Sequence, residues 1–418
     1  MRANPLSDTD GPLSQNTRKL LQTVGEIAES EGMRPYLVGG AVRDSLLEKP
    51  IHDLDLCVEG HAPELANTIE RNLGAIISMQ SQFLTARIEL DGTTLDISTC
   101  REESYSEPTV LPHVQPASID HDLARRDFTI NAMAIDISPQ RWGTLLDPFN
   151  GTVDLKNRNI RSLHENSFAD DPTRIFRALR YSLRLDFNIS PSTMHDIERH
   201  GHYISQLSSD RLIAELRKIC AEPRFNDIFT LAQTLGIMAR IHPSLRWPTE
   251  QASATNEALN HGLSQEDIFL ATTGYFFPEH DQINALSDRI TNSNRSRDLL
   301  LNAAALKSLE NYLTEPHLLA SIIHRHLSIY QDYSLNVVKA VTNNDVFAQI
   351  LSRELNEFRL VQTNLTARDL LEIGVPEGPA IGSLLGILLA NILDNPTTTR
   401  EEEVTIVTEW MHNPSNNH

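Results

Sequence analysis

Two aspartates, Asp53 and Asp55, stand two residues apart in the segment HDLDLCV, where an apolar run predicts the start of a β-strand. Alternate residues of a strand point to the same side of a sheet, so both carboxylates are expected on one face. Two such carboxylates repel each other unless a cation lies between them, and oxygen ligands suit Mg²⁺. The pair therefore predicts a magnesium site; the alternative is a solvated Asp-x-Asp turn.

A glycine pair, Gly39 and Gly40, precedes these aspartates in GGAVRD and separates a predicted strand from a helix that begins near Val42. Free backbone amides at a helix N-terminus can bind a triphosphate, and Arg43 adds positive charge. Phosphates beside metal-binding carboxylates indicate phosphoryl or nucleotidyl transfer. Taken alone, GGAVRD also fits an ordinary strand–helix bend. Asp96, in LDIST on a later predicted strand, is a candidate third metal ligand or a strand-edge carboxylate.

A helix predicted from Asp171 carries arginines three or four residues apart, which places them on one face. They are Arg174, Arg177, Arg180 and Arg184, and the opposite, apolar face holds Ile175, Leu179 and Leu183. Four arginines in a row repel one another, so the stripe predicts an anionic partner; the alternative is a solvated basic face. Asp171 itself stands at an N-cap position, followed by Pro172 at the first helical position.

A second arginine pair, Arg125 and Arg126, precedes Asp127 in the segment ARRDFTINA, and Asn131 follows. Guanidinium groups bind phosphate oxygens through paired hydrogen bonds, so this pair suits a triphosphate or a sugar. A surface ion pair between arginine and aspartate is the structural alternative.

The composition limits the class of protein. The chain has 418 residues, 40% of them hydrophobic, and a net charge of −20. It shows no apolar run that could span a bilayer and no secretory signal, so we expect a soluble, cytoplasmic protein with no membrane partner. Three scattered cysteines predict reduced thiols. The acidic charge argues against nonspecific coating of nucleic acid, and no DNA partner is expected.

The predicted secondary structure that must position these residues is mixed in the N-terminal part of the chain and helical beyond it. A predicted helix at 17–31 is followed by short apolar runs at 35–38, 54–58, 75–78, 85–89 and 94–97, with an Asp91-Gly92 hairpin turn between the last two. This part reads as a mixed α+β domain. The proline-containing stretch 101–120 predicts a loop. Beyond Asp154 the pattern is helical, with helices near 171–187, 191–201, 209–221 and 225–236, others within 254–360, and a last pair at 366–373 and 378–394.

The first of these motifs, Gly-Gly-x-Val-Arg-Asp followed by Asp-x-Asp, resembles that of the class II tRNA nucleotidyltransferases and their bacterial poly(A) polymerase relatives, members of the polymerase β superfamily. The resemblance continues in order through DLARRDFTINAMAID, DPFNGTVDLKNRNIR, FADDPTRIFRALRYSLRLDF and LSSDRLIAELRKI, and LTARDLLEIGVPEGPAIGSLLG is similar to the family's tail. It implies an α+β fold: a polymerase β-like nucleotidyltransferase head with a mixed β-sheet (1–153), then an all-helical neck (154–222), body (223–345) and tail (346–418).

The resemblance also implies a role for each motif residue. Asp53 and Asp55 are expected to be catalytic and to bind Mg²⁺, and Gly39, Gly40, Arg43 and Arg126 to bind the nucleotide. Asp171 and Arg174 are expected to read the Watson–Crick edge of the incoming base, and Arg177 and Arg180 to contact its phosphates or sugar. The chain departs from the family at Asp170, where a glutamate is usual, and this shorter acid puts the positioning of Asp171 in doubt.

The function implied is template-independent addition of CCA, from CTP and ATP, to the tRNA 3′ end. Relatives that add only A, only CC or a poly(A) tail share these motifs, and the portion LPHVQPASI resembles the A-adding and poly(A) members more than common CCA enzymes. A non-catalytic RNA-binding relative and a small-molecule nucleotidyltransferase are the rivals from other classes. No oligomeric state is predicted.

Overall fold

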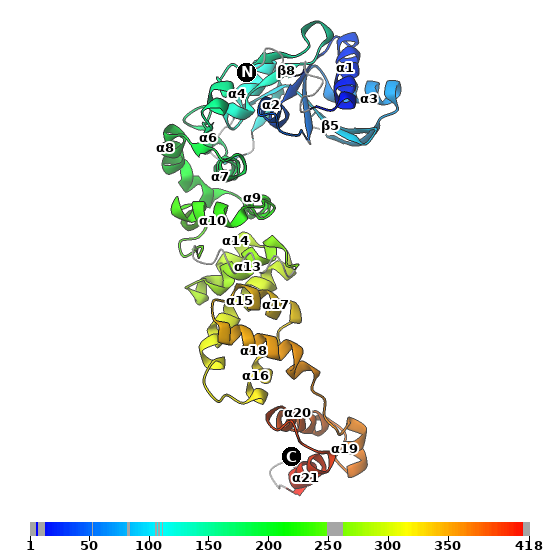
Figure 1. Ribbon diagram of the computed structural model, residues 1–418, viewed down its shortest axis with the longest axis vertical. Helices are drawn as coiled ribbons and strands as arrows, with labels where there is room; N and C mark the ends of the chain where they lie inside the picture. Colours follow the sequence, from blue (N-terminus) through cyan, green and yellow to red (C-terminus); the bar gives the residue numbers. More distant parts are fainter. Residues whose placement is uncertain are drawn as a thin grey trace. The chain divides into compact units, whose positions relative to one another are not determined.

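The computed structural model describes residues 6, 13–51, 53–81, 84–104, 107, 109–110, 112–248 and 262–412. Contacts along the chain divide it into two compact units, Met1–Arg224 and Phe225–His418 (Figure 1). The first unit contains the sheet and the second is helical in its described part, in agreement with the α+β fold that the sequence predicts.

The first unit is built on a seven-stranded sheet with the order β3-β4-β5-β2-β1-β8-β9. Its strands are β1 (Arg34–Val38), β2 (Leu54–Glu59), β3 (Ile76–Ser81), β4 (Thr85–Leu90), β5 (Thr93–Thr99), β8 (Ala134–Asp136) and β9 (Thr144–Leu146). Neighbours are antiparallel except β2 and β5, which are parallel, so the sheet is mixed. The predicted hairpin turn is confirmed: Asp91 and Gly92 join β4 to β5 with φ of 49° and 75°, the positive values that a tight two-residue turn requires.

The two faces of β2 have different neighbours, and this difference exposes the aspartates. Leu54, Leu56 and Val58 alternate on one face and are buried. Cys57 points the other way and packs with Tyr36 beneath helix α4 (Ile119–Ala124). Asp53 and Asp55 lie on the same side as Cys57 by the two-residue period of a strand, but there the sheet borders a cavity instead of a helix.

Three further helices pack around the sheet: α1 (Gln15–Ser30), α2 (Gly40–Leu46) and α3 (Ala62–Leu73). Helix α1 begins where the Ser14 side chain accepts a hydrogen bond from the Thr17 amide, and α3 begins with Pro63 in its first turn and ends at Gly74 in the left-handed conformation. Such caps fix the ends of α3, which contacts β3, β4 and β5.

The stretch 101–120 is not the loop that its prolines predict. Strands β6 (Arg101–Ser104) and β7 (His113–Pro116) pair antiparallel in a separate two-stranded sheet. A proline has no amide hydrogen to donate, but it is tolerated at the edge of a sheet, and Pro116 occupies the last position of a strand in a sheet that has only edges. Residues 105, 106, 108 and 111, which belong to the predicted loop, lie outside the described residues.

The remaining elements of the first unit are helical apart from the short parallel pair β10 (Asn159–Ile160) and β11 (Asn188–Ile189). The α-helices among them are α5 (Gly151–Lys156), α6 (Ser167–Asp170), α7 (Thr173–Leu185), α8 (Pro191–His200) and α9 (Ser209–Cys220). The long basic helix that the sequence predicts corresponds to α7, which ends where Asp186 takes a left-handed conformation at φ 60°.

The second unit contains only helices among its described residues. Its α-helices are α10 (Phe225–Thr234), α11 (Ile237–Ile241), α13 (Gln265–Tyr275), α14 (Ile283–Ile290), α15 (Asn294–Leu313), α16 (Ala320–Leu327), α17 (Asp332–Val341), α18 (Asp345–Asn356), α19 (Ala367–Ile373), α20 (Pro379–Asp394) and α21 (Arg400–His412). Part of the predicted helical stretch, 254–261, lies outside the described residues. Helix α21 was not predicted; it is held by Glu403, which accepts hydrogen bonds from the Asn364 and Leu365 amides. No helix of the described chain is long and apolar enough to cross a membrane.

Candidate active site

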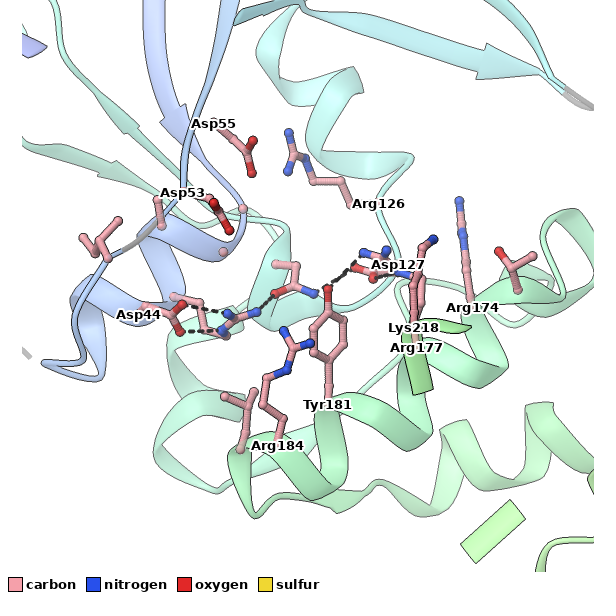
Figure 2. A pocket seen from close by; sticks show the side chains of 18 of the residues that line it. Asp44, Asp53, Asp55, Arg126, Asp127, Arg174, Arg177, Tyr181, Arg184 and Lys218 are labelled. Atoms are coloured by element: carbon pink, nitrogen blue, oxygen red, sulfur yellow. Dashed lines mark hydrogen bonds and ion pairs between the residues drawn. The ribbon is translucent and has the colours of Figure 1, made fainter. Parts of the chain in front are cut away.

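The sequence-predicted residues gather around one cavity of about 810 Å³ in the first unit (Figure 2). Nine of them line it: Gly39, Gly40, Arg43, Asp53, Asp55, Arg126, Asp171, Arg174 and Arg177. Two candidates, Asp96 and Arg180, do not line it. The cavity is therefore bordered by a glycine turn, by the carboxylates beside β2 and by the basic face of α7.

The carboxylate pair carries negative charge that the protein only partly neutralises. Asp53 is exposed and Asp55 is half-buried, and Asp55 lies in register with Asp96 on β5. Burial and the neighbouring Asp96 raise the pKa of the Asp55 carboxyl, and the Arg126 guanidinium opposes this shift. Figure 2 shows the Asp55 carboxylate facing Arg126. Such a face favours an additional cation.

The two carboxylates fit a Mg²⁺ ion that is bound jointly by protein and substrate, and not a metal site built from protein ligands alone. No group of three His, Cys, Asp or Glu side chains among the described residues is arranged to hold a metal ion. Mg²⁺ usually binds through one or two carboxylates together with substrate phosphates and water. Asp53 and Asp55 beside a cavity that arginines also line match that requirement.

Asp96 has a different partner. Its two carboxylate oxygens accept hydrogen bonds from Arg87 Nε and Nη2 at 2.7 and 2.8 Å. Arg87 therefore pairs with Asp96, which lies on β5 next to β2. This pairing agrees with the alternative that Asp96 is a carboxylate at the edge of a strand and not a metal ligand. A role for Asp96 as a third metal ligand stays a prediction.

The glycine turn holds two residues with different requirements. Gly39 has φ 66° and ψ −126°, a conformation that a side chain disfavours, and a Cβ there would lie 2.9 Å from Arg126 Nη1. Arg126 cannot easily yield, because its Nε and Nη2 donate to Asp122 Oδ2 at 3.2 and 2.8 Å. Gly40 is helical, and a Cβ there meets Arg43 Nη2 at 3.5 Å, an ordinary contact.

We expect Gly39→Ala to weaken nucleotide binding about tenfold and to destabilise the fold by about 1–3 kcal/mol, the usual cost of a forced backbone conformation. Gly40→Ala is the matched control and should keep both properties near those of the unmodified protein. Urea unfolding and the KM for ATP measure the two effects. Equal behaviour of the two variants would contradict the geometry.

A chain of hydrogen bonds joins α2 to α7 across one wall of the cavity (Figure 2). Arg43 Nη1 donates to Asn131 Oδ1 at 2.8 Å, and Asn131 Nδ2 donates to Asp127 Oδ1 at 3.1 Å. Arg177 Nε donates to Asp127 Oδ2 at 2.7 Å. Asp44 accepts from Arg43 through both of its oxygens at 2.9 Å. The wall is thus preorganised, with each guanidinium oriented by a carboxylate.

The two residues expected to read the base are also held in place. Asp171 Oδ1 accepts from the Thr173 amide at 3.0 Å, as an N-terminal cap would, and from Arg211 Nη2 at 2.7 Å. Arg174 is buried, and its Nη1 and Nη2 donate to Ser167 Oγ at 2.8 Å and Arg125 O at 2.7 Å. Because a guanidinium carries five N–H groups, Arg174 keeps donors for a ligand.

Asp170, the departure from the family pattern, does not line the main cavity. Its Oδ2 lies 3.7 Å from His164 Nε2, and both side chains border a neighbouring cavity of about 230 Å³. Burial lowers the pKa of His164, although Asp170 acts in the opposite direction. Asp171, not Asp170, is the acid of this pair that lines the main cavity.

The sequence suggests that the arginines of α7 need an external anion, but the protein itself supplies acidic partners for three of them. Arg177 pairs with Asp127, while Arg180 Nε donates to Glu222 at 2.9 Å and Arg184 Nε donates to the same carboxylate at 3.0 Å. Asp127 accordingly raises the pKa of Arg177. Arg180 was expected at the phosphates, but it does not line the cavity, whereas Arg184, which contacts the same carboxylate, does. A phosphate contact by Arg180 stays a prediction.

Some lining residues were missed from the sequence, above all Tyr181 and Lys218. Tyr181 follows Arg177 by one helical turn, so its position on the basic face could have been read from the period of α7. Lys218 lies in the LSSDRLIAELRKI motif on α9, and its approach to the cavity depends on helix packing. Arg211, in the same motif, was also missed as the partner of Asp171.

Known protein families match two parts of the chain. The Poly A polymerase head domain matches residues 35–161, which contain the glycine turn and both aspartates. A second family, described as the probable RNA and SrmB-binding site of polymerase A, matches residues 186–247.

The chain matches curated relatives over different shares of their lengths. An A-adding tRNA nucleotidyltransferase of Aquifex aeolicus is 41% identical over 217 residues, 51% of this chain and 26% of that protein. A protein of the same name from Geobacter sulfurreducens is 29% identical over 94% of this chain and 47% of its own length. Another, from Halalkalibacterium halodurans, is 28% identical over 96% of this chain and 94% of its own length. The chain thus spans about a quarter and about half of the first two.

Solved structures match nearly the whole chain. The Thermotoga maritima CCA-adding enzyme complexed with tRNA has a TM-score of 0.71 at 26% identity and covers 97% of this chain and 98% of its own. CCA-adding enzyme complexes with ATP and with CTP have TM-scores of 0.75 and 0.76 at 25% and 26% identity, covering 96% of this chain and 97% of their own. Motif order, family matches and fold agree: the chain contains a Poly A polymerase head domain at residues 35–161 and is similar over nearly its whole length to solved CCA-adding enzymes.

Proposed function

We propose that the protein is a template-independent tRNA nucleotidyltransferase that adds CCA to the tRNA 3′ end from CTP and ATP. The observation that carries this proposal is the single cavity bordered by Asp53 and Asp55, by the Gly39 turn and by the Asp171–Arg174 pair. Carboxylates for a metal, amides and guanidiniums for phosphates, and an acceptor–donor pair for a base are the parts that such a reaction needs.

In the proposed reaction the RNA 3′-hydroxyl attacks the α-phosphorus in line, and pyrophosphate leaves. Mg²⁺ held by Asp53 and Asp55 would supply activation of the hydroxyl and neutralisation of the leaving group. Arg126 and Arg177 orient the phosphates through their fixed guanidinium groups. Asp171 accepts and Arg174 donates at the edge of the base, so that protein side chains take the place of a template strand.

The partners proposed are the tRNA 3′ end, CTP and ATP, in the cytoplasm. We also propose the finer division into head (1–153), neck (154–222), body (223–345) and tail (346–418). In this division the head and neck together supply every residue of the cavity, and the RNA is bound by the body and tail. The family match at 186–247, described as an RNA-binding site, supports an RNA contact near the start of the body.

Addition of A alone is the second candidate. Three relatives, including the one from Halalkalibacterium halodurans that is matched over most of its length, are named A-adding tRNA nucleotidyltransferases. The segment LPHVQPASI also resembles members of that kind.

One assay separates the candidates. The protein is incubated with tRNA lacking its end, tRNA ending in C, tRNA ending in CC and an unrelated RNA, with CTP and ATP supplied separately and together. CCA addition extends the first three substrates to a common length, whereas A-only addition extends only the CC-ending substrate and only with ATP. Extension of the unrelated RNA by many residues indicates poly(A) synthesis, and no extension of any substrate refutes the enzymatic proposal.

A further inference from the structure

Tyr181 occupies a position in the cavity that the reaction as proposed does not use. Its ring lies within 6 Å of three guanidinium carbons: those of Arg43 at 5.4 Å, Arg177 at 5.4 Å and Arg184 at 5.7 Å. Arg43 comes from α2, and the other two flank Tyr181 on α7. Figure 2 shows the tyrosine ring close to Arg184 on the same helix.

Three like charges around one ring need compensation. Among the described residues each guanidinium has one acidic partner, namely Asp44 for Arg43, Asp127 for Arg177 and Glu222 for Arg184. These acids lie on different elements, so none of them holds the three cations together. The aromatic ring attracts cations through its negative face, and it is the group that all three arginines share.

The ring is itself held from two sides. Phe128, which is fully buried, meets it edge to face with centroids 5.9 Å apart. The hydroxyl accepts a hydrogen bond from Arg177 Nη2 at 3.1 Å. The contact with Phe128 is independent of the arginines, so the ring can set their positions instead of following them.

The cluster retains donors for a ligand. In Arg177, Nε donates to Asp127 and Nη2 to Tyr181; in Arg184, both Nε and Nη2 donate to Glu222. Within the described residues, the Nη1 group of each arginine therefore makes no hydrogen bond to protein. Two planar donors beside one ring are suited to the oxygens of a polyphosphate.

We propose that Tyr181 is a positioning residue that holds Arg43, Arg177 and Arg184 as one anion-binding cluster for the triphosphate of the incoming nucleotide. This inference rests on the proposed function and extends it, because it makes Arg184, in place of Arg180, the last member of the phosphate-binding set. The contact is with phosphate and not with base, so Tyr181 should affect CTP and ATP equally.

The test compares Tyr181→Leu, which removes the ring, with Tyr181→Phe, which keeps the ring and removes only the hydroxyl. Tyr181→Leu should raise the KM for CTP and for ATP about tenfold each and weaken pyrophosphate binding by the same factor, with kcat and the KM for tRNA within about twofold. Tyr181→Phe should recover most of this affinity, to within about threefold of the unmodified protein. Tyr203→Leu is the control, since Tyr203 stacks on His200, lies tilted against His202 and does not line the cavity.

Three outcomes would overturn the inference: a Tyr181→Leu variant with unchanged nucleotide KM, unequal effects on CTP and ATP, or a Tyr181→Phe variant as impaired as Tyr181→Leu. The last result would assign a direct contact to the hydroxyl. Pyrophosphate binding to the full chain, measured by calorimetry without RNA, separates this inference from the proposed function. If the unmodified protein transfers no nucleotide but the ring still controls pyrophosphate binding, the cluster stands and the proposed function falls.

Discussion

Replacing Asp55 by asparagine is expected to abolish nucleotide transfer and, at the same time, to stabilise the metal-free protein. The loss of transfer should be at least about a thousandfold, the scale seen when one essential catalytic group is removed. The gain in stability follows from the electrostatics of the sheet face, where burial and Asp96 raise the pKa of the Asp55 carboxyl. A neutral amide of the same shape removes that repulsion. Single-turnover incorporation into tRNA and urea unfolding without Mg²⁺ measure the two effects.

The sign of the pH dependence supplies a second readout of the same variant. A carboxyl whose pKa is raised in the folded state destabilises the fold at pH values above that raised pKa, and the cost disappears as the pH falls toward the ordinary value of about 3.9. The stability gained by Asp55→Asn should therefore be largest at neutral pH and should shrink on acidification. Added Mg²⁺ should stabilise the unmodified protein and not the variant.

The controls separate charge from position. Asp91→Asn removes a carboxylate from the exposed β4–β5 turn and should leave transfer intact. Asp53→Asn should match Asp55→Asn in transfer, because both carboxylates are proposed to bind the same ions. Asp96→Asn tests the third-ligand prediction: a loss of transfer similar to that of Asp55→Asn would make Asp96 a ligand despite its pairing with Arg87. Transfer by Asp55→Asn near the unmodified rate would refute the assignment of the aspartates.

Local patterns were sufficient to predict most of the candidate residues that line this cavity, because each motif is short. The two-residue period of β2 places Asp53 and Asp55 together, and the glycine pair at the start of α2 marks the turn. The hairpin at Asp91-Gly92 and the basic helix α7 were likewise confirmed. Each of these features depends on spacing within one element or on one turn.

Features that depend on contacts between elements could not be read from spacing. The stripe of α7 predicts four equivalent arginines, but Glu222, which follows α9, engages Arg180 and Arg184, and only packing decides which of the two lines the cavity. Arg211 reaches Asp171 across 40 residues of chain, and the pairing of β6 with β7 spans a proline-containing stretch. Glu222 and Arg211 lie about 40 residues from their partners in sequence, and neither carries a local signal.

Replacing Asp127 by asparagine is expected to have the largest effect on stability among the site variants, about 3 kcal/mol, together with a large loss of nucleotide affinity. Asp127 is buried and accepts hydrogen bonds from Arg177 Nε at 2.7 Å, Asn131 Nδ2 at 3.1 Å and the Phe128 amide at 2.8 Å. An amide can keep part of this geometry but not the charge, so Arg177, whose side chain is 35% exposed, would remain without its ion pair. Breaking one partner of a fully buried pair usually costs about 3–5 kcal/mol, and the partial exposure of Arg177 places the expected cost at the lower end of this range.

The pH dependence of the stability tests whether the charge of Asp127 is responsible for this effect. Burial alone would raise the pKa of the Asp127 carboxyl, but Arg177 and the hydrogen bonds from Asn131 and the Phe128 amide lower it below its ordinary value. A lowered pKa contributes stability that is complete above the unfolded value of about 3.9 and is lost as the pH falls toward the folded value. Asp127→Asn should therefore lose stability at pH 7 and lose little more on acidification, whereas the unmodified protein should approach it at low pH.

A double variant distinguishes loss of the ion pair from general damage. Arg177→Met removes the cation while keeping an unbranched side chain, and combining it with Asp127→Asn leaves no unpaired charge. The double variant should therefore be less destabilised than the sum of the single variants, by 0.5–3 kcal/mol, the usual range of coupling for neighbouring residues. Additive losses in urea unfolding would show that the Asp127–Arg177 pair does not hold the cavity wall, and the preorganised network from Arg43 to Arg177 would then lose its main support.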